Sequence, residues 1–259
     1  MPARPFSLVK WYMDCVTDEG DVAIVYCGDL NWRGLHVHLS SVLSSDAERL
    51  GTRTSVSQYQ VNCDGGRISA DLPKLAVAGV WESDSGSFER LVFEDKTGSV
   101  NWNCIQPRSR ATLQIGDRQF SGLGYAECVT LTTLPWELPL SQLRWGRFVS
   151  PRDSLAWVDW QGPYVSSFAL YNGEERKLLA LSDSEVAIPG AALQIEAGLA
   201  LRSGRLVSTI LPGTPELGKL LPRSIFNVEE HKWKSRGLLF NEDHSSSGWV
   251  IHEVVKWEV

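Results

Sequence analysis

A chain of 259 residues is long enough to form one large domain or two small domains, each with a real core. Hydrophobic residues make up 43% and charged residues 22%, which excludes a disordered, collagen-like or coiled-coil protein. Lysine and arginine total 25 against 31 aspartates and glutamates, and the resulting net charge of -6 predicts no nucleic-acid partner.

The cysteines and the N-terminus bear on the compartment. The 5 cysteines are odd in number and contain no CxxC pair, so the sequence predicts neither a disulfide framework nor a zinc ribbon and favours a reducing cytoplasm. The first residues lead into Trp11 without an apolar segment, and no uninterrupted apolar run is long enough for a membrane helix. We therefore expect a cytoplasmic protein with neither a signal peptide nor a membrane span.

Short β-rich segments separated by turn residues follow one another along the chain. Strands are predicted where β-branched and aromatic residues cluster, at residues 22–26, 35–39, 112–115 and 155–160. Turns are predicted at residues 64–66, 96–98, 172–173 and 202–204. Helix signals are confined to residues 45–50 and 72–80, and the second segment contains Gly79 and fits an extended strand equally well. The sequence predicts an all-β, antiparallel protein.

The two halves of the chain repeat a weak pattern. Trp11 precedes one predicted strand as Trp145 precedes another, and Glu127 stands in a segment similar to the one around Glu253. The join falls where Pro135 and Pro139 interrupt regular structure. We expect two similar domains, residues 1–133 and 134–259, although β-rich segments can also match by chance.

Three stretches resemble a known group of proteins. Residues 122–127, 134–139 and 143–148 are similar to the centre of the lipocalin-like superfamily that includes carotenoid hydratase, and residues 10–14 resemble its first-strand aromatic motif. Lipocalin-type Diels–Alderases are related to this group. The resemblance implies two consecutive lipocalin-like antiparallel β-barrels or half-barrels with a pocket for an apolar small molecule. It does not fix the reaction, because one fold hosts several chemistries.

Glu127 is the first candidate catalytic residue. Alternation in a strand places it on the same face as Tyr125, so a carboxyl group lies beside a phenol that could help it to give or take a proton. The alternative is a structural role, either as an inter-domain hydrogen-bonding pair or with Glu127 bonded to Arg144 or Arg147.

Asp159 is the second candidate. It shares a strand face with Trp157, and an acid beside an indole suits a reaction through a cation, which is the chemistry that the hydratase resemblance implies. The alternative is that Asp159 caps the turn that follows it while Trp157 fills the core.

His36 and His38 lie two residues apart on a predicted strand, so both can reach one ligand, and His252 with Glu253 could add donors. The sequence carries no HExxH motif, and we favour a pair that lines a pocket or faces solvent without a metal. No complete dinucleotide, Walker or nucleophile-elbow motif is present, so we expect no cofactor.

The aromatic residues of the predicted strands supply the remaining candidates. The expected ligand-binding set is Trp11, Tyr26, His36, His38, Trp102, Trp145, Arg147 and Trp157. With these residues the sequence favours a cofactor-independent isomerase, cyclase, hydratase or related lyase of specialised metabolism that acts on a hydrophobic small molecule. A carrier of such a molecule is the alternative, and a module that binds another protein through exposed tryptophans is a third. The oligomeric state is not predicted.

Overall fold

The computed structural model describes residues 6–46, 49–83, 85–205, 207 and 226–257. Over this part the chain is all-β and divides into two compact units, Met1–Leu138 and Pro139–Val259. The sequence places the join at 133/134, a few residues before this division.

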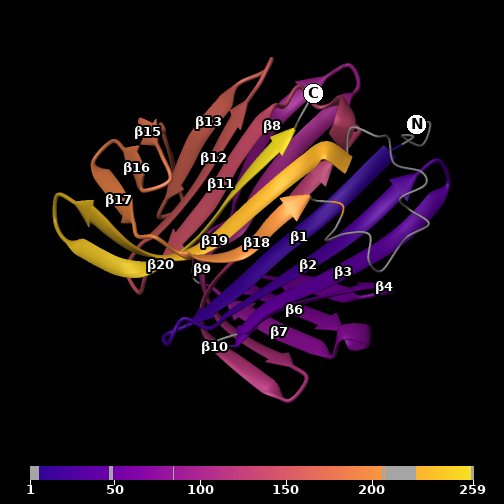
Figure 1. Ribbon diagram of the computed structural model, residues 1–259, viewed down its shortest axis with the longest axis horizontal. Helices are drawn as coiled ribbons and strands as arrows, with labels where there is room; N and C mark the ends of the chain where they lie inside the picture. Colours follow the sequence, from indigo (N-terminus) through magenta and orange to yellow (C-terminus); the bar gives the residue numbers. More distant parts are fainter. Residues whose placement is uncertain (1–5, 47–48, 84, 206, 208–225, 258–259) are drawn as a thin grey trace. The chain divides into compact units, whose positions relative to one another are not determined.

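The first unit is a curled antiparallel sheet whose strands run along a half-barrel (Figure 1). Neighbouring strands in the sheet follow the order β4 (Arg49–Val56), β3 (Leu35–Asp46), β2 (Val22–Trp32), β1 (Phe6–Thr17), β10 (Arg118–Leu131), β9 (Gly98–Ile115), β7 (Val77–Glu82), β6 (Arg67–Leu72) and β5 (Gln60–Asp64). A tenth strand, β8 (Phe88–Asp95), pairs with the first part of β9.

The second unit repeats this order strand for strand. Its sheet follows β14 (Glu174–Arg176), β13 (Ser166–Tyr171), β12 (Ser154–Gln161), β11 (Gln142–Val149), β20 (Ser245–Trp257), β19 (Val228–Asn241), β17 (Ala191–Ile195), β16 (Glu185–Ile188) and β15 (Ala180–Leu181), and β18 (Leu199–Arg205) pairs with β19. The predicted fold class, two consecutive lipocalin-like antiparallel domains, is therefore confirmed, with each domain a half-barrel.

The register of the repeated strands corrects the alignment of the two halves by one residue. Glu127 lies directly opposite Tyr12, and Glu253 lies directly opposite Trp145. The structural counterpart of Trp145 is therefore Tyr12 and not Trp11.

Each sheet has its own core on one face, which we call the core face. In the first unit Met13, Trp81 and Phe120 are among the buried residues of that face. In the second unit Phe148 and Trp157 pack there with aliphatic side chains of β16, β17 and β19. Successive side chains of a strand alternate between faces, so residues next to these in sequence point to the opposite face.

Three local predictions differ from the structure. Residues 72–80 form a short 3-10 helix, η1 (Pro73–Leu75), and then enter β7, because Pro73 can begin such a turn while the residues around Gly79 pair with β6 and β9. Residues 202–204 are not a turn but part of β18, where Gly204 pairs with Glu230. In the other predicted helix, residues 45–46 and 49–50 belong to strands, and residues 47–48 lie outside the described part.

Candidate functional site

Five polar and aromatic residues converge on the opposite face of the first sheet. We call Tyr12, Asp14, Trp102, Tyr125 and Glu127 the Glu127 cluster. The register aligns Tyr12 with Glu127 and Asp14 with Tyr125, so the four side chains of β1 and β10 lie on one face. Tyr125 and Asp14 are completely buried, and Glu127 is 6% exposed.

Two donors meet on one oxygen of the glutamate. The Tyr125 hydroxyl donates to Glu127 Oε2 at 2.7 Å, and the Trp102 indole Nε1 donates to the same atom at 2.6 Å. In the same cluster the Tyr12 hydroxyl donates to Asp14 Oδ2 at 2.8 Å. Hydrogen bonds to a carboxylate are strong and fix its orientation, so the cluster presents Glu127 in a defined position.

Burial and charge keep the phenol of Tyr125 protonated. Desolvation raises the pKa of Tyr125 well above its ordinary value, and the neighbouring Cys104 and Glu127 raise it further. Desolvation likewise raises the pKa of the Cys104 thiol. Tyr125 is therefore a hydrogen-bond donor to Glu127 at any physiological pH.

A close approach of backbone and indole supports the cluster from the core face. The Trp81 Nε1 donates to the backbone oxygen of Asp14 at 2.7 Å. A Cβ at Gly124 would lie 2.3 Å from that same oxygen and 3.0 Å from the Trp81 ring, so the chain needs a glycine immediately before Tyr125. The Gly-Tyr-Ala-Glu segment thus places the acid and allows the tryptophan to fit.

The predicted binding residues of the first unit separate into two groups. Tyr26 joins the Glu127 cluster, because its ring packs edge-on against Tyr12 with centroids 5.4 Å apart. Trp11 packs against the residues of the core face. His36 and His38 lie close together, with ring centroids 4.4 Å apart, and Asp29 Oδ1 is 2.5 Å from His36 Nε2.

In the second unit the predicted residues also divide between faces. Trp157 is buried in the core, and Asp159 on the same strand accepts hydrogen bonds from the Gln161 amide at 2.9 Å and from Ser167. Trp145 lies on the opposite face, where the Lys232 ammonium is 5.4 Å from its ring centroid. Arg147 is buried and donates to the backbone oxygen of Trp249 at 2.7 Å.

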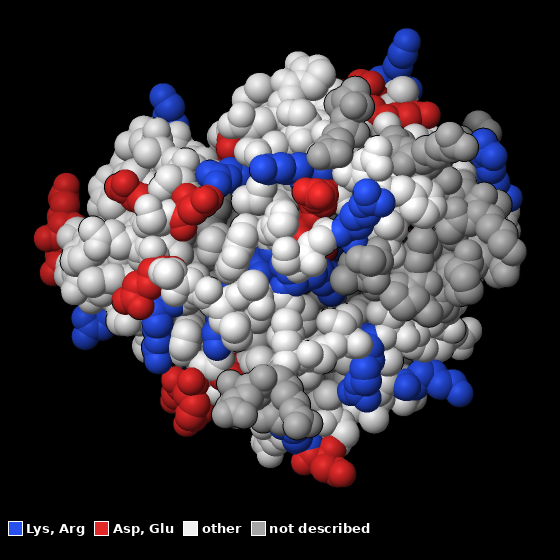
Figure 2. Space-filling view, in the orientation of Figure 1, with Lys and Arg blue, Asp and Glu red and all other residues white. Residues whose placement is uncertain are grey.

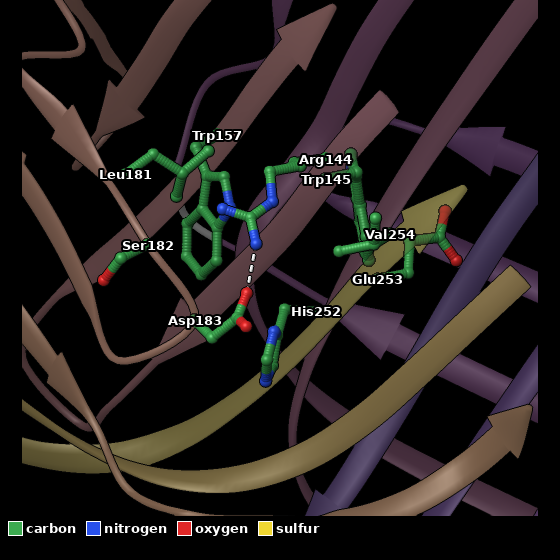
Figure 3. A pocket seen from close by; sticks show the side chains of 9 residues that line it. All are labelled: Arg144, Trp145, Trp157, Leu181, Ser182, Asp183, His252, Glu253 and Val254. Atoms are coloured by element: carbon green, nitrogen blue, oxygen red, sulfur yellow. Dashed lines mark hydrogen bonds and ion pairs between the residues drawn. The ribbon is translucent and has the colours of Figure 1, made fainter. Parts of the chain in front are cut away.

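A polar constellation that the sequence analysis did not assemble lies in the second unit (Figure 3). Arg144 is ion-paired with Asp183, and these two residues line a small cavity with Trp157 and His252. Its volume of about 10 Å³ is room for roughly one water molecule. The carboxyl group of Glu253 points away from Asp183 and His252 (Figure 3).

No family model matches this sequence, and no curated protein matches it. Solved structures do match it in fold. A candidate AttH from Nitrosomonas europaea is 8% identical, with a TM-score of 0.60 over 96% of this chain and 92% of that one. Kievitone hydratase from Nectria haematococca is 10% identical, with a TM-score of 0.58 over 96% and 88%, and CghA with Sch210972 is 12% identical, with a TM-score of 0.57 over 98% and 89%.

The chain has the tandem lipocalin-like fold. It shares this fold with the three solved structures, as the sequence resemblance leads us to expect. Identities of 8–12% do not transfer the role of any residue, so the role of each residue in this tandem lipocalin-like chain rests on its own geometry.

The surface of the described residues carries both charges. On the face drawn in Figure 2, acidic and basic side chains are interspersed. No helix of the described residues is long and apolar enough to span a membrane.

Proposed function

We propose that this protein is a cofactor-independent enzyme that transfers a proton to or from a hydrophobic small molecule, with Glu127 as the acid–base group. The observation that carries the proposal is the pair of hydrogen bonds from Tyr125 and Trp102 to a single oxygen of a buried carboxyl group. Such an arrangement holds a proton-transferring group in place before the substrate arrives, which is what general acid–base catalysis requires.

The surroundings of Glu127 suit an apolar or aromatic substrate. The rings of Tyr12, Tyr26 and Tyr125 are in edge-on contact, with centroid separations of 5.4 and 6.1 Å. Aromatic faces stabilise positive charge, so a carbocation formed by protonation of an alkene would be favoured beside them. Acid-catalysed hydration, isomerisation and cyclisation of alkenes begin with such a step. A protein of the same fold is named a hydratase, which supports this class of reaction.

Asp159 is the second acid in the proposal, with Trp157 beside it on the core face of the other unit. Gln161 and Ser167 donate to its two carboxyl oxygens, Oδ2 and Oδ1. These donors are the last residue of β12 and a residue of β13, a placement that also fits the capping role. We therefore assign the proton transfer to Glu127 first.

Carriage of a small molecule without catalysis is favoured by a different observation. An open groove of about 440 Å³ crosses the first sheet, which is within the size range of ligand pockets. Apart from the aliphatic Val80, its lining residues are small or polar: Ser69, Ala70, Ala78, Gly79, Thr112, Gln114 and Gln119. No acidic residue lines the groove. A carrier that bound its ligand there would therefore keep its ligand affinity when Glu127 is replaced.

The test separates these two functions. The protein is incubated in D₂O and in H₂¹⁸O with a panel of alkenyl phenols and terpenoids that includes kievitone, and the gain of deuterium or ¹⁸O is followed by mass spectrometry. Because a general acid or base contributes about 10²–10⁴-fold, E127Q should lower the rate at least about 100-fold, a barrier increase of about 3 kcal/mol. Tyr125→Phe should lower it less, because the carboxyl group remains.

The matched control is Glu89→Gln, the same change on β8 at an exposed residue, which should leave the rate unchanged. Circular dichroism and urea unfolding establish that each variant is folded. Turnover by E127Q within a few-fold of the wild-type rate would contradict the proposal. A loss confined to Asp159→Asn would move the chemistry to the second unit.

A further inference from the structure

The hairpin of β2 and β3 brings a carboxylate to the two histidines that the sequence pairs. Arg33 and Gly34 form a two-residue turn with φ of 50° and 80°, and this turn fixes the register of the two strands. Asp29 on β2 consequently lies directly opposite His38 on β3. Because side chains alternate along a strand, His36 points to the same face as His38.

The three side chains offer one ligand atom each within a small space. These atoms of Asp29, His36 and His38 all lie within 4.8 Å of one another. Asp29 Oδ1 is 2.5 Å from His36 Nε2, and Asp29 Oδ2 is 3.9 Å from His38 Nδ1. Tetrahedral coordination with metal–nitrogen bonds of about 2.0–2.1 Å requires ligand atoms about 3.3 Å apart. The three side chains are 30–51% exposed, which leaves them room to rotate toward that spacing.

The donor set selects a class of metal ion. Two imidazole nitrogens and one carboxylate oxygen suit borderline cations such as Zn²⁺, Cu²⁺ and Ni²⁺, whereas Mg²⁺ and Ca²⁺ prefer oxygen ligands only. Aromatic packing limits the freedom of His38, since the ring of Tyr59 meets it edge-on with centroids 5.7 Å apart. Solvent reaches His36, so water can complete the coordination shell.

We propose that Asp29, His36 and His38 form a binding site for a borderline divalent metal ion, for which Zn²⁺ is the reference, that joins β2 to β3. This proposal replaces the expectation that the histidine pair binds no metal. That expectation considered His36 and His38 alone and did not include Asp29 from the neighbouring strand. The proposal is independent of the chemistry proposed for Glu127, which lies on the opposite face of the sheet.

The experiment titrates the full-length, tag-free chain with ZnCl₂ in a calorimeter. All variants carry Cys63→Ser, because Cys63 is an exposed free thiol that could bind zinc by itself. We expect one saturable site per chain. Mutation of a residue that only orients a metal ligand already lowers metal affinity about 10-fold or more. Removal of a direct ligand should lower the affinity at least as much, so D29N, H36A and H38A should each raise the Kd for Zn²⁺ at least about 10-fold. MgCl₂ and CaCl₂ should give no saturable binding.

The matched control is His231→Ala. His231 also lies near a carboxylate, with its Nε2 3.9 Å from Glu229 Oε2. Among the described residues, however, this pair is not part of a group of three possible metal ligands. The control should leave the Kd unchanged. In electron paramagnetic resonance, Cu²⁺ bound to the protein should show coupling to two nitrogen nuclei, and H36A should reduce this to one.

Circular dichroism tests whether each variant is folded. We expect all three to fold, because the substituted side chains are partly exposed. No saturable binding of Zn²⁺, or binding that D29N, H36A and H38A leave within two-fold of the starting Kd, would overturn the proposal. A Cu²⁺ spectrum without nitrogen coupling would do the same.

Discussion

His252 lies in a partly buried environment that shifts its pKa. It lies on β20, stacked on the ring of Trp233 with centroids 5.2 Å apart, and its Nε2 is 3.5 Å from the Ser235 hydroxyl. Burial lowers the pKa of His252 from 6.5 to about 4, with Asp183 and Glu253 opposing the shift and Arg144 and Lys232 adding to it. The imidazole is therefore neutral in the folded protein at pH 7.

This shift predicts a specific loss of stability in acid. The unfolded chain takes up a proton on this residue near pH 6.5, and the folded chain does so only near pH 4. Between these values the unfolded state binds more protons, so the free energy of unfolding falls as the pH falls, by at most about 3 kcal/mol from this group. Below pH 4 the contribution of His252 causes no further loss.

Urea unfolding of the wild type and of His252→Gln at pH 7 and pH 4 measures the effect. The loss of stability between the two pH values should be smaller in the variant, because glutamine does not titrate. Gln58→Asn, a change at an exposed residue that does not titrate, is the control, and it should leave the loss of stability equal to that of the wild type. Equal losses in wild type and His252→Gln would contradict the prediction.

The pairing of β11 with its neighbours depends on a glycine. A Cβ at Gly146 would lie 2.2 Å from the Trp157 ring and 2.8 Å from the Cβ of His252, which is closer than atoms approach without displacement. Trp157 is a large, rigid side chain that is 2% exposed in the core. Gly146 is thus required by the close fit of the indole against β11.

Gly146→Ala is predicted to destabilise the protein by about 1–3 kcal/mol, the usual cost of overpacking a core. Urea unfolding followed by tryptophan fluorescence measures this cost and reports on Trp157 itself. Gly51→Ala on the edge strand β4 is the control, because a Cβ there has no atom within 4 Å, and it should be neutral or slightly stabilising. A neutral Gly146→Ala would show that the Trp157 ring can move aside freely.

The strands were largely predictable because alternation and turn residues are local signals. The segments that begin β2 and make up β12 carry runs of β-branched and aromatic residues, and the turns at residues 64–66, 96–98 and 172–173 fall between strands. The predicted turn at residues 202–204 was wrong. A glycine beside a serine and an arginine is typical of turns, but here Gly204 pairs with Glu230 of β19 and is part of a strand. Tertiary pairing of this kind is not encoded in a short window of sequence.

The candidate site was predictable only where its residues share a strand. Tyr125 and Glu127 lie two residues apart on β10, so the period of the strand places them together. Trp102 reaches Glu127 from β9, and the register of that pair shifts at irregularities around Ala126, which no local pattern shows. For the same reason the sequence did not place Asp29 beside the two histidines, because Asp29 lies on the neighbouring strand β2 and reaches them only through strand pairing.

Each unit contains a complete core. The buried cluster of the second unit draws on residues from its first strand to its last, Phe148 to Val250, and every pairing of its sheet is made within the unit. A segment with its own sheet and core can fold independently.

Residues 139–259, expressed alone, are therefore predicted to fold. Circular dichroism should show a β spectrum, and urea should unfold the fragment in one cooperative transition. Gly146→Ala in the fragment should lower the midpoint of that transition, which would show that the native core has formed. A fragment that has no cooperative transition would contradict the prediction.

The repetition of the sheet places two glutamates at equivalent positions with different neighbours. Glu127 on β10 lies opposite Cys104, whereas Glu253 on β20 lies opposite the buried Lys232 and is ion-paired with it. Each sheet has a core of its own, so the two glutamates lie on sheets whose buried clusters are made of different residues. Duplication of the fold thus allows two copies of one acidic position to diverge during evolution, one into a buried ion pair and the other into a carboxyl group held by a phenol and an indole.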